Sequence, residues 1–349
     1  TNGKTTCAFL LRDILQHAGQ RPGMIGTVHY ELGNRTLPAD RTTPTAFDFQ
    51  AMLAEMVGAG LESVVLEISS HALDQRRIGS VPLHGALFTN LSGDHLDYHL
   101  TMERYLEAKT LLFTEYLAPG APAVLNCDDP DGARMAAHLL TRDPPVRLRT
   151  YGCTPGADAC MRDCRTSLTG TTLSLALPDG DLSLSTPAMG LFNAYNVAGV
   201  VALADALGIP WDAIKAATAA FEGAPGRLEP ITGTNGLKVF VDYAHTDDAL
   251  RNVLATLRAL NPETLRVVFG CGGERDRSKR ARMAKVAAEL ADVLIITTDN
   301  PRREDPARII DDMRAGLPPD KDATVIADRA TAIYQAVADS GGRDALLIA

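Results

Sequence analysis

The segment T-N-G-K-T-T at residues 1–6 has the residue types of a phosphate-binding loop and leads directly into a helical pattern. At the start of a helix, backbone N–H groups face phosphates, a lysine reaches the terminal phosphates and a hydroxyl binds magnesium. A chance Gly-Lys-Thr is the alternative, because only the second half of such a loop is present. The helical pattern and the motifs described below favour a nucleotide site.

Carboxylate and imidazole side chains follow two apolar runs farther along the chain. Glu67 closes one run, and D-H-L-D-Y-H at residues 94–99 offers four potential metal ligands in six positions. Hard oxygen ligands near a phosphate loop favour magnesium, with zinc as the alternative. A polar loop in which Asp and His only form turns would explain the same residues. Because both segments follow strands, we predict a metal site.

Lys109 lies within the apolar stripe of a predicted helix. The stripe consists of Met102, Tyr105, Leu106, Leu112 and Phe113. Burial disfavours a charged ammonium group, and a neutral amine can react with carbon dioxide to give an anionic carbamate. That group could hold magnesium or orient a reacting group. The spacing by itself favours the alternative, in which the stem is buried and the amine reaches solvent.

The second half of the chain contains a basic, glycine-rich segment and a tight polar turn. The segment G-C-G-G-E-R-D-R-S-K-R at residues 270–280 joins a predicted strand to a predicted helix, where its arginines and lysine could bind carboxylates or phosphates. In D-N-P-R at residues 299–302, Arg302 could bind a carboxylate with two parallel hydrogen bonds. A flexible basic loop and an ordinary turn are the alternatives.

The elements that must position these residues follow from hydrophobic periodicity. A helix is predicted after the first loop, with Gly19 as its stop. Apolar runs alternate with helical patterns, which indicates an α/β fold with a mostly parallel sheet and helices on its faces. The predicted strands are residues 24–28, 64–68, 86–89, 123–126, 237–241, 265–269, 293–298, 324–326 and 345–349. Residues 146–186 are expected to form a small antiparallel sheet, and residues 193–207 a helix.

Each polar cluster lies just past the carboxyl end of a predicted strand. Open parallel sheets bind ligands at that edge, and loop composition alone would not place every cluster there. The linker-like segment 222–227 divides the chain, so we expect one ATP-binding domain over residues 1–225 and a second, Rossmann-like α/β domain over residues 226–349.

Composition excludes several classes of protein. The 349 residues exceed one ordinary core, and 46% hydrophobic with 22% charged residues is typical of a globular protein. A net charge of -9 disfavours nucleic-acid binding, and no apolar stretch is long enough for a membrane helix. The six cysteines have no paired spacing, which indicates a reducing compartment. Since the chain starts inside a loop motif and stops inside an apolar run, we expect an interior piece that would be inactive alone.

Taken together, these motifs resemble those of the Mur ligase family along essentially the whole chain. Residues 1–6 resemble the end of its G-T-N-G-K-T-T loop, and residues 67–71 resemble E-V-S-S-H. Residues 90–99 resemble N-L-S-x-D-H-L-D-Y-H, and residues 241–246 match V-D-Y-A-H-T. Residues 270–279 resemble the G-C-G-G-x-R-D loop with its trailing lysine. Gly93 and Asp247 depart from frequent family residues, and neither change removes a chemical group named here.

The resemblance implies a role for each motif residue. Catalytic roles would fall to Lys4, Lys109 and His95, and Lys109 would be carried as the carbamate N6-carboxylysine. Magnesium ligands would be Thr5, Glu67 and His95. ATP would contact Thr1, Asn2, Gly3, Lys4, Thr5, Thr6, Asn193, Asn196, Arg227, Asp242 and His245. The UDP-muramoyl substrate would face Thr42, Thr43, Ser69 and Arg77. Diaminopimelate would contact Arg275, Asp299, Asn300 and Arg302.

The D-N-P-R turn resembles that of the diaminopimelate-adding members of the family. The resemblance implies an ADP-forming ligase that joins meso-diaminopimelate to UDP-MurNAc-L-Ala-D-Glu in peptidoglycan synthesis, with Mg²⁺ as cofactor and ATP as co-substrate. ATP would first phosphorylate the D-glutamyl carboxylate, and the amine would then displace phosphate from the acyl phosphate. The guanidinium of Arg302 would bind the second carboxylate of diaminopimelate, which lysine lacks.

Three alternatives fit the same residues: a lysine-adding sibling ligase, a folylpolyglutamate synthetase and a non-catalytic nucleotide-binding module. We expect a cytoplasmic monomer that binds neither nucleic acid nor membrane. The ligase hypothesis requires that Thr5, Glu67, His95 and Lys109 gather around a single cavity.

Overall fold

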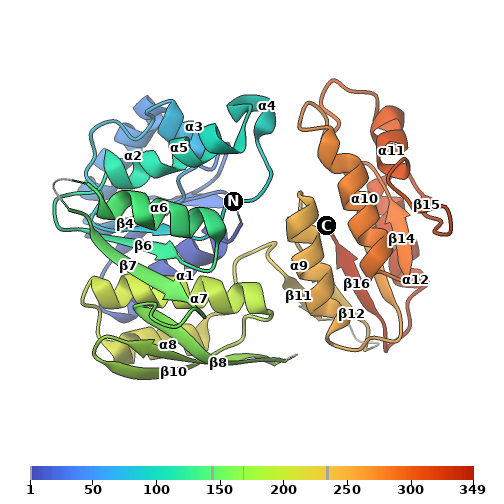
Figure 1. Cartoon of the computed structure of the whole chain (residues 1–349). Helices are drawn as coiled ribbons and strands as arrows, with labels where there is room; N and C mark the ends of the chain where they lie inside the picture. The colour runs from blue at the N-terminus through green and yellow to red at the C-terminus, as the bar shows by residue number, and fades with distance from the viewer. Residues whose placement is uncertain (1, 143–144, 168, 233–235) are drawn as a thin grey trace. The chain divides into compact units, whose positions relative to one another are not determined.

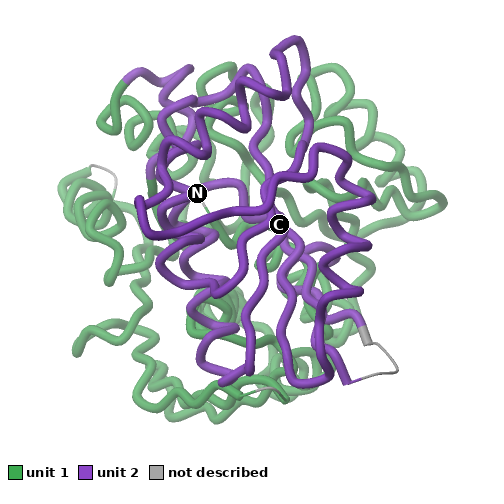
Figure 2. Tube along the Cα trace, turned by 90° about the vertical axis from the view of Figure 1, so that its right-hand side faces the viewer, with its two compact units in different colours: residues 1–92, 101–224 green, residues 93–100, 225–349 purple. Residues whose placement is uncertain are grey.

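The computed structural model describes residues 2–142, 145–167, 169–232 and 236–349. The chain forms two compact units, shown in different colours in Figure 2. Unit 1 comprises residues 1–92 and 101–224, and unit 2 comprises residues 93–100 and 225–349. The short segment 93–100 therefore groups with unit 2, although the chain on both sides of it belongs to unit 1.

The first helix of unit 1 begins inside the loop motif. Helix α1 spans Lys4–His17, and Leu10 and Ile14 on its inner face are completely buried. Gly19 follows with a φ of 82°, a left-handed conformation that suits glycine and ends the helix. The predicted helix and its stop are confirmed.

Two sheets form the framework of unit 1 (Figure 1). The first has the order β3-β2-β1-β4, in which β1 and β4 are parallel and the other pairs are antiparallel. Its strands are β1 Pro22–Ile25, β2 His29–Glu31, β3 Thr36–Pro38 and β4 Ser63–Leu66. The second has the order β10-β9-β8-β7-β6-β5. Its strands are β5 Ala86–Phe88, β6 Pro122–Asn126, β7 Arg147–Gly152, β8 Ala159–Ser167, β9 Gly170–Leu177 and β10 Gly180–Thr186.

The remaining helices of unit 1 flank these sheets (Figure 1). They are α2 Ala46–Gly58, α3 Ser70–Asp74, α5 Met102–Thr114, α6 Pro130–Leu140, α7 Leu191–Ala206 and α8 Trp211–Ala220. Helix α7 is apolar on nearly every side and is buried in the main core. An all-round apolar helix is expected at such a position.

The sheet arrangement differs from the prediction in two respects. The antiparallel strands β8, β9 and β10 do not form a separate small sheet, because β7 pairs in parallel with both β6 and β8 and so joins them to the parallel strands. The four predicted parallel strands of unit 1 lie in two sheets, with β1 and β4 in one and β5 and β6 in the other. The periodicity of apolar residues indicates that a strand is buried. It does not indicate which other strand pairs with it, because that depends on segments far away in the chain.

Unit 2 contains one six-stranded sheet with the order β11-β12-β16-β13-β14-β15. Its strands are β11 Glu229–Thr232, β12 Lys238–Val241, β13 Leu265–Phe269, β14 Val293–Ile296, β15 Thr324–Val325 and β16 Ala345–Ile348. All neighbouring pairs are parallel except β11 with β12. The helices are α4 Leu96–His99, α9 Asp247–Arg258, α10 Ser278–Leu290, α11 Pro306–Arg314 and α12 Arg329–Ala338.

The five parallel strands of unit 2 agree with the predicted ones, and the edge strand β11 was missed. The polar segments that begin at Asp242, Gly270 and Thr297 follow β12, β13 and β14 directly, so they share one edge of the sheet. Over the described part of the chain, no helix is both long enough and apolar enough to cross a bilayer.

Candidate active site

Gly3 allows the loop before α1 to approach α7 closely. Its φ is 87°, and a Cβ at this position would lie 2.2 Å from Asn196 Oδ1. The Asn196 amide donates to Asn193 Oδ1 at 3.1 Å, and the Asn193 amide donates to the Met189 carbonyl at 2.9 Å. The structure thus brings three predicted ATP-binding residues together, and only glycine fits at the first of them.

Asn2 is fixed on both sides by the segment that follows β5. Its backbone N–H donates to Asn90 Oδ1 at 2.8 Å, and its carbonyl accepts from Thr89 Oγ1 at 2.7 Å and Asn90 Nδ2 at 3.1 Å. Sequence reasoning missed the role of Asn90, although the residue follows a predicted strand. These bonds hold the loop in place before a phosphate arrives. Thr1, also predicted to bind ATP, lies outside the described residues.

Glu67 is a buried carboxylate, 2% exposed, that lies against the start of α1. It accepts hydrogen bonds from Thr5 Oγ1 at 2.9 Å, the Thr27 N–H at 2.7 Å and Thr27 Oγ1 at 3.0 Å. A Cβ on Gly26 would lie 2.5 Å from Glu67 Oε1, so a larger residue there would displace the carboxylate. Thr27 was not predicted, because nothing in its local sequence marks it.

Lys4 and Thr6 complete the helix start. Burial is the largest cause that raises the pKa of Cys7 to about 12, with the Glu67 charge adding to the rise and the Lys4 charge opposing it. Both charges therefore act on the same buried thiol, one turn into α1. Thr6 is buried at 5% exposure, which makes its side chain part of the packing of this helix.

The oxygen atoms around Thr5 suit magnesium. Among the described residues, no cluster of three or more His, Cys, Asp or Glu side chains has the arrangement of a metal site. Magnesium, however, is usually held by one or two carboxylates together with water and substrate phosphates. The Thr5 hydroxyl and the Glu67 carboxylate, 2.9 Å apart beside a phosphate-type loop, are hard ligands of that kind. The fit supports magnesium over zinc.

Thr43 links the residues predicted to face the UDP-muramoyl substrate. Its hydroxyl donates to the Glu67 carbonyl at 2.9 Å and accepts from the Ser69 N–H at 3.1 Å. Arg77 Nη1 donates to the Thr43 carbonyl at 3.1 Å. Thr42 Oγ1 lies 3.1 Å from Thr27 Oγ1, which itself contacts the Glu67 carboxylate. This predicted set therefore surrounds the end of β4.

Lys109 is buried at 9% exposure within α5, in the predicted apolar stripe. Its Nζ lies 4.9 Å from the centre of the Tyr105 ring, one turn earlier. The side chain as a whole is therefore largely removed from solvent, as both the buried-amine prediction and its alternative require of the stem. Its position relative to Thr5 and Glu67, and its modification, stay predictions.

His95 belongs to the 93–100 segment and therefore to unit 2. Buried Asp94 lies 3.5 Å from His95 Nε2 and 3.4 Å from His245 Nε2. Burial opposes ionisation of Asp94, but the hydrogen bond with His245 and the charges of His95 and Lys279 hold its pKa well below the usual range. Two predicted residues, His95 and His245, thus share one carboxylate. Whether His95 meets Thr5 and Glu67 stays a prediction.

Asp242 follows β12 and is buried at 9% exposure. It accepts from the Leu228 N–H at 2.7 Å, and the guanidinium of Arg227 lies 5.1 Å from the Tyr243 ring centre. Burial raises the pKa of Asp242 to about 6, although Arg227, the Leu228 N–H and His245 oppose the rise. The charges of Arg227 and His245 therefore both act on Asp242, and the shared nucleotide-binding role of the three residues stays a prediction.

Three of the four predicted diaminopimelate residues, Asp299, Asn300 and Arg302, contact the 270–280 loop. The Gly273 N–H donates to the Asn300 carbonyl at 2.9 Å, and Arg302 Nη1 donates to the Gly273 carbonyl at 2.5 Å. A Cβ on Gly273 would lie 2.0 Å from the Pro301 carbonyl oxygen, so glycine is required there. The Asp299 backbone similarly lies against Gly270. Arg275 is exposed in the same loop.

Arg280 is a basic residue of this loop whose side chain is engaged inside the protein. Its side chain is 1% exposed and forms ion pairs with Glu304 at 2.9 Å and Asp312 at 2.8 Å. A guanidinium that is buried away from water needs carboxylate partners close by. Here the partners come from a segment farther along the chain, and no local sequence pattern links that segment to the loop. Glu304 was likewise missed, two residues after Arg302.

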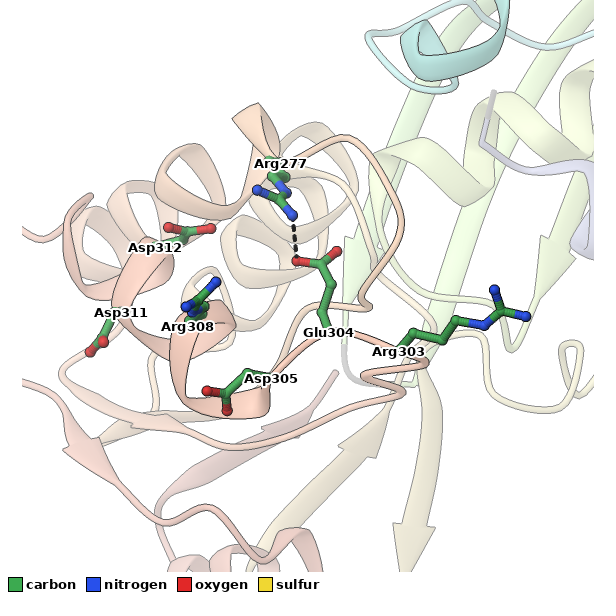
Figure 3. A pocket seen from close by; sticks show the side chains of 7 residues that line it. All are labelled: Arg277, Arg303, Glu304, Asp305, Arg308, Asp311 and Asp312. Atoms are coloured by element: carbon green, nitrogen blue, oxygen red, sulfur yellow. Dashed lines mark ion pairs between the residues drawn. The ribbon is translucent and has the colours of Figure 1, made fainter.

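A charged cavity of about 520 Å³ borders Glu304 on the surface of unit 2 (Figure 3). Its lining includes Arg277, Arg303 and Arg308. Glu304 points toward Arg277, with which it forms an ion pair at 3.2 Å, whereas Arg303 points away from both (Figure 3). The adjacent residues Arg302 and Arg303 thus differ. Arg302 donates a hydrogen bond to the Gly273 carbonyl of the loop, and Arg303 points away from Glu304 and Arg277.

Comparison with known proteins assigns the chain to a family. Residues 1–204 match the family model of the Mur ligase middle domain, and residues 226–349 match that of the Mur ligase glutamate ligase domain. The chain belongs to the Mur ligase family. The boundaries of its domains at residues 225 and 226 stay predictions, and the compact units divide after residue 224.

Curated relatives that resemble the chain over its whole length share one name. The UDP-N-acetylmuramoyl-L-alanyl-D-glutamate–2,6-diaminopimelate ligase of Synechococcus elongatus is 43% identical over the whole chain, which spans 69% of that relative. The ligase of the same name from Bacillus licheniformis is 41% identical, and the chain spans 71% of it.

Solved structures give the same result. A structure of a diaminopimelate ligase of that name is 35% identical, with a TM-score of 0.69 over the whole chain and 71% of the relative. The folylpolyglutamate synthase of Mycobacterium tuberculosis complexed with ADP has a TM-score of 0.79 over 99% of the chain and 85% of its own, at 19% identity. At that identity the likeness shows the fold alone. The Mur ligase chain therefore has the predicted α/β fold.

Proposed function

We propose that this Mur ligase chain carries the ATP-dependent, ADP-forming addition of meso-diaminopimelate to UDP-MurNAc-L-Ala-D-Glu. One observation supports this assignment most directly. Arg302 is fixed by the Gly273 carbonyl at 2.5 Å, in the same turn as Asn300 and Asp299. A guanidinium held in one orientation binds a carboxylate selectively. Diaminopimelate carries a second carboxylate, and lysine does not.

In the first step, unit 1 would bind and align ATP. The N–H groups at the start of α1 and the Lys4 ammonium attract the phosphates, and Asn2 is already fixed by Asn90. Thr5 and Glu67 would hold magnesium, which offsets the negative charge of the transferred phosphoryl group when bound. Phosphoryl transfer needs this charge balance and alignment more than covalent help. The product would be an acyl phosphate on the D-glutamyl carboxylate.

In the second step, the amine of diaminopimelate would attack the acyl phosphate and release phosphate. Unit 2 supplies the residues proposed to hold the amino acid, namely Arg275, Asp299, Asn300 and Arg302. Holding the second carboxylate fixes the distal end of the substrate and so limits where its reacting amine can lie. An amino acid that lacks the carboxylate leaves the arginine without its partner, which costs affinity.

The acceptor would bind unit 1 around Thr43, with Thr42, Ser69 and Arg77. His95 is proposed as a further magnesium ligand and Lys109 as a carbamate that supports the same site. We also propose that the protein works in the cytoplasm, where ATP and the nucleotide-linked acceptor meet, and that it acts as a monomer.

Competition between meso-diaminopimelate and lysine in the full-length protein tests this function. The unmodified protein should incorporate diaminopimelate almost exclusively. Arg302→Ala should lower kcat/KM for diaminopimelate about 100-fold and leave the slow use of lysine nearly unchanged. Arg303→Ala is the matched control, because it removes the same charge one residue away and should change kcat/KM less than about threefold. Equal use of both amino acids by the unmodified protein would refute the proposal.

The order of the two steps has its own test. With the acceptor present and diaminopimelate absent, an acyl-phosphate intermediate predicts exchange of ATP oxygens between bridging and non-bridging positions. The same exchange without the acceptor would count against phosphorylation of the D-glutamyl carboxylate.

A further inference from the structure

A buried arginine lies behind the two segments proposed to bind diaminopimelate. The Arg280 guanidinium donates to both oxygens of Glu304, at 3.1 and 2.9 Å, and to Asp312 at 2.8 Å. It also donates to the Gly272 carbonyl at 3.4 Å. A charge that is 1% exposed is costly unless it is paired, so the positions of these partners are strongly coupled to one another.

Glu304 contacts the 270–280 loop at three points. Its carboxylate pairs with Arg280, lies 3.2 Å from Arg277 and accepts the Glu274 N–H. The hydrogen bond with Arg280, and then that with the Glu274 N–H, lower the pKa of Glu304 to about 2. The Glu304 carboxylate is therefore ionised at neutral pH. Because Glu304 follows Arg302 by two positions, it joins the turn to the loop.

These contacts converge on Gly273 from both sides. Arg280 holds the carbonyl of Gly272, the preceding residue, and Glu304 holds the N–H of Glu274, the following residue. The carbonyl between them accepts the hydrogen bond from Arg302 Nη1. The orientation of the Arg302 guanidinium thus depends on where the Gly273 carbonyl points, and the Arg280–Glu304 pair sets that direction.

We propose that Glu304, anchored by buried Arg280, is a positioning residue that orients Arg302 through the Gly273 carbonyl and thereby sets selectivity for an amino acid with a second carboxylate. This inference rests on the proposed function. Neither residue needs to touch the substrate. Replacement of the carboxylate by an amide removes the charge and leaves one acceptor oxygen for the Arg280 guanidinium, Arg277 and the Glu274 N–H together. The Glu274 N–H then competes with two guanidinium groups for that oxygen, so the Gly273 peptide can turn. A displacement of about 1 Å in a positioning group can cost 100-fold.

The test compares Glu304→Gln with Asp312→Asn in the full-length protein. Both changes remove one carboxylate charge from the same Arg280 guanidinium, but only Glu304 also contacts the 270–280 loop backbone. Steady-state kinetics would be measured for ATP, the UDP-linked acceptor, meso-diaminopimelate and lysine. Thermal unfolding would show whether each variant is folded at the assay temperature.

Glu304→Gln is expected to raise KM for diaminopimelate about tenfold or more and to lower the preference over lysine by a similar factor. KM for ATP and for the acceptor should stay within about twofold, and Asp312→Asn should retain the preference within about threefold. An equal loss with all substrates, or an unchanged preference in folded Glu304→Gln, would overturn the inference.

Two further measurements keep the inference testable if Glu304→Gln does not fold. Glu304→Asp keeps the charge and shortens the reach, so it should lower the preference less than Gln would but in the same direction; an unchanged preference would overturn the inference. In the Arg302→Ala background, Glu304→Asp should change KM for diaminopimelate little, because the group it orients is absent. Additive effects would contradict the coupling. If the unmodified protein itself shows no preference, the proposed function fails, and this inference fails with it.

Discussion

Thr5 and Glu67 are 62 positions apart in the chain, and the Thr5 hydroxyl donates to the Glu67 carboxylate at 2.9 Å. The first residue lies in the opening turn of α1, and the second follows β4. The carboxylate is 2% exposed and receives two further hydrogen bonds from Thr27. Two hard oxygen-bearing side chains are thus held against each other beside a phosphate-type loop.

Replacement of Glu67 should impair chemistry more than folding. Glu67→Gln keeps the size of the side chain and its bond to the Thr27 N–H, but it removes the negative charge proposed to hold magnesium. We expect kcat to fall about 100-fold or more and the magnesium concentration for half-maximal rate to rise. Glu55→Gln, on the surface beside Arg35, is the control and should change neither value. A normal magnesium titration with Glu67→Gln would contradict the assignment.

Gly3→Ala should damage both nucleotide binding and stability. The added Cβ would lie 2.2 Å from Asn196 Oδ1, at a φ of 87°. Gly19→Ala is the matched control, because its φ is 82° but nothing lies within 4 Å of the new Cβ. We expect about 1 kcal/mol of lost stability at Gly19 and clearly more at Gly3. Thermal unfolding would measure the loss of stability, and calorimetric titration with ATP would measure the loss of nucleotide binding. Equal losses of stability in the two variants would refute the proposed close approach at Gly3.

Lys109 should carry a carbamate if its buried amine is neutral and reacts with carbon dioxide, as proposed. Intact-protein mass spectrometry under bicarbonate should detect the added mass of one carbon dioxide on the unmodified protein and not on Lys109→Met. The Met variant keeps the apolar packing of α5 and should lose about 100-fold or more in kcat. Lys215→Met, at an exposed position of α8, should retain the added mass and full activity. Full activity of Lys109→Met would exclude a catalytic role.

Asp242 should make stability depend on pH. Burial raises its folded-state pKa from 3.8 to about 6, so the folded protein keeps a proton that the unfolded chain has already lost between these values. The contribution of this group to stability therefore falls as pH rises from about 4 to about 6, by roughly 3 kcal/mol.

Asp242→Asn removes this titration and can still accept the Leu228 N–H. The stability of the variant relative to the unmodified protein should therefore increase between pH 4 and pH 6 and stay level above it. Urea unfolding at a series of pH values measures the difference. A constant difference over that range would show that Asp242 titrates normally in the folded protein.

Local patterns in the sequence determined a large part of this molecule. The helix that starts at Lys4, the five parallel strands of unit 2 and the placement of Glu67, Asp242 and Gly270 after strands all follow from periodicity and chain order. The resemblance of six motifs led to the family that the comparisons confirm. These features could be predicted because each depends on residues that are close together along the chain.

Only the tertiary structure decided which groups meet. Periodicity could not assign the predicted strands of unit 1 to two sheets, since pairing depends on segments far apart. It could not reveal that Thr27 shares the Glu67 carboxylate with Thr5. Nor could it show that Arg280, one of several cations in one loop, is buried against Glu304 while Arg302 holds the Gly273 carbonyl. A buried charge must pair with whichever opposite charge lies close to it in the folded protein. The order of residues along the chain does not show which charge that is.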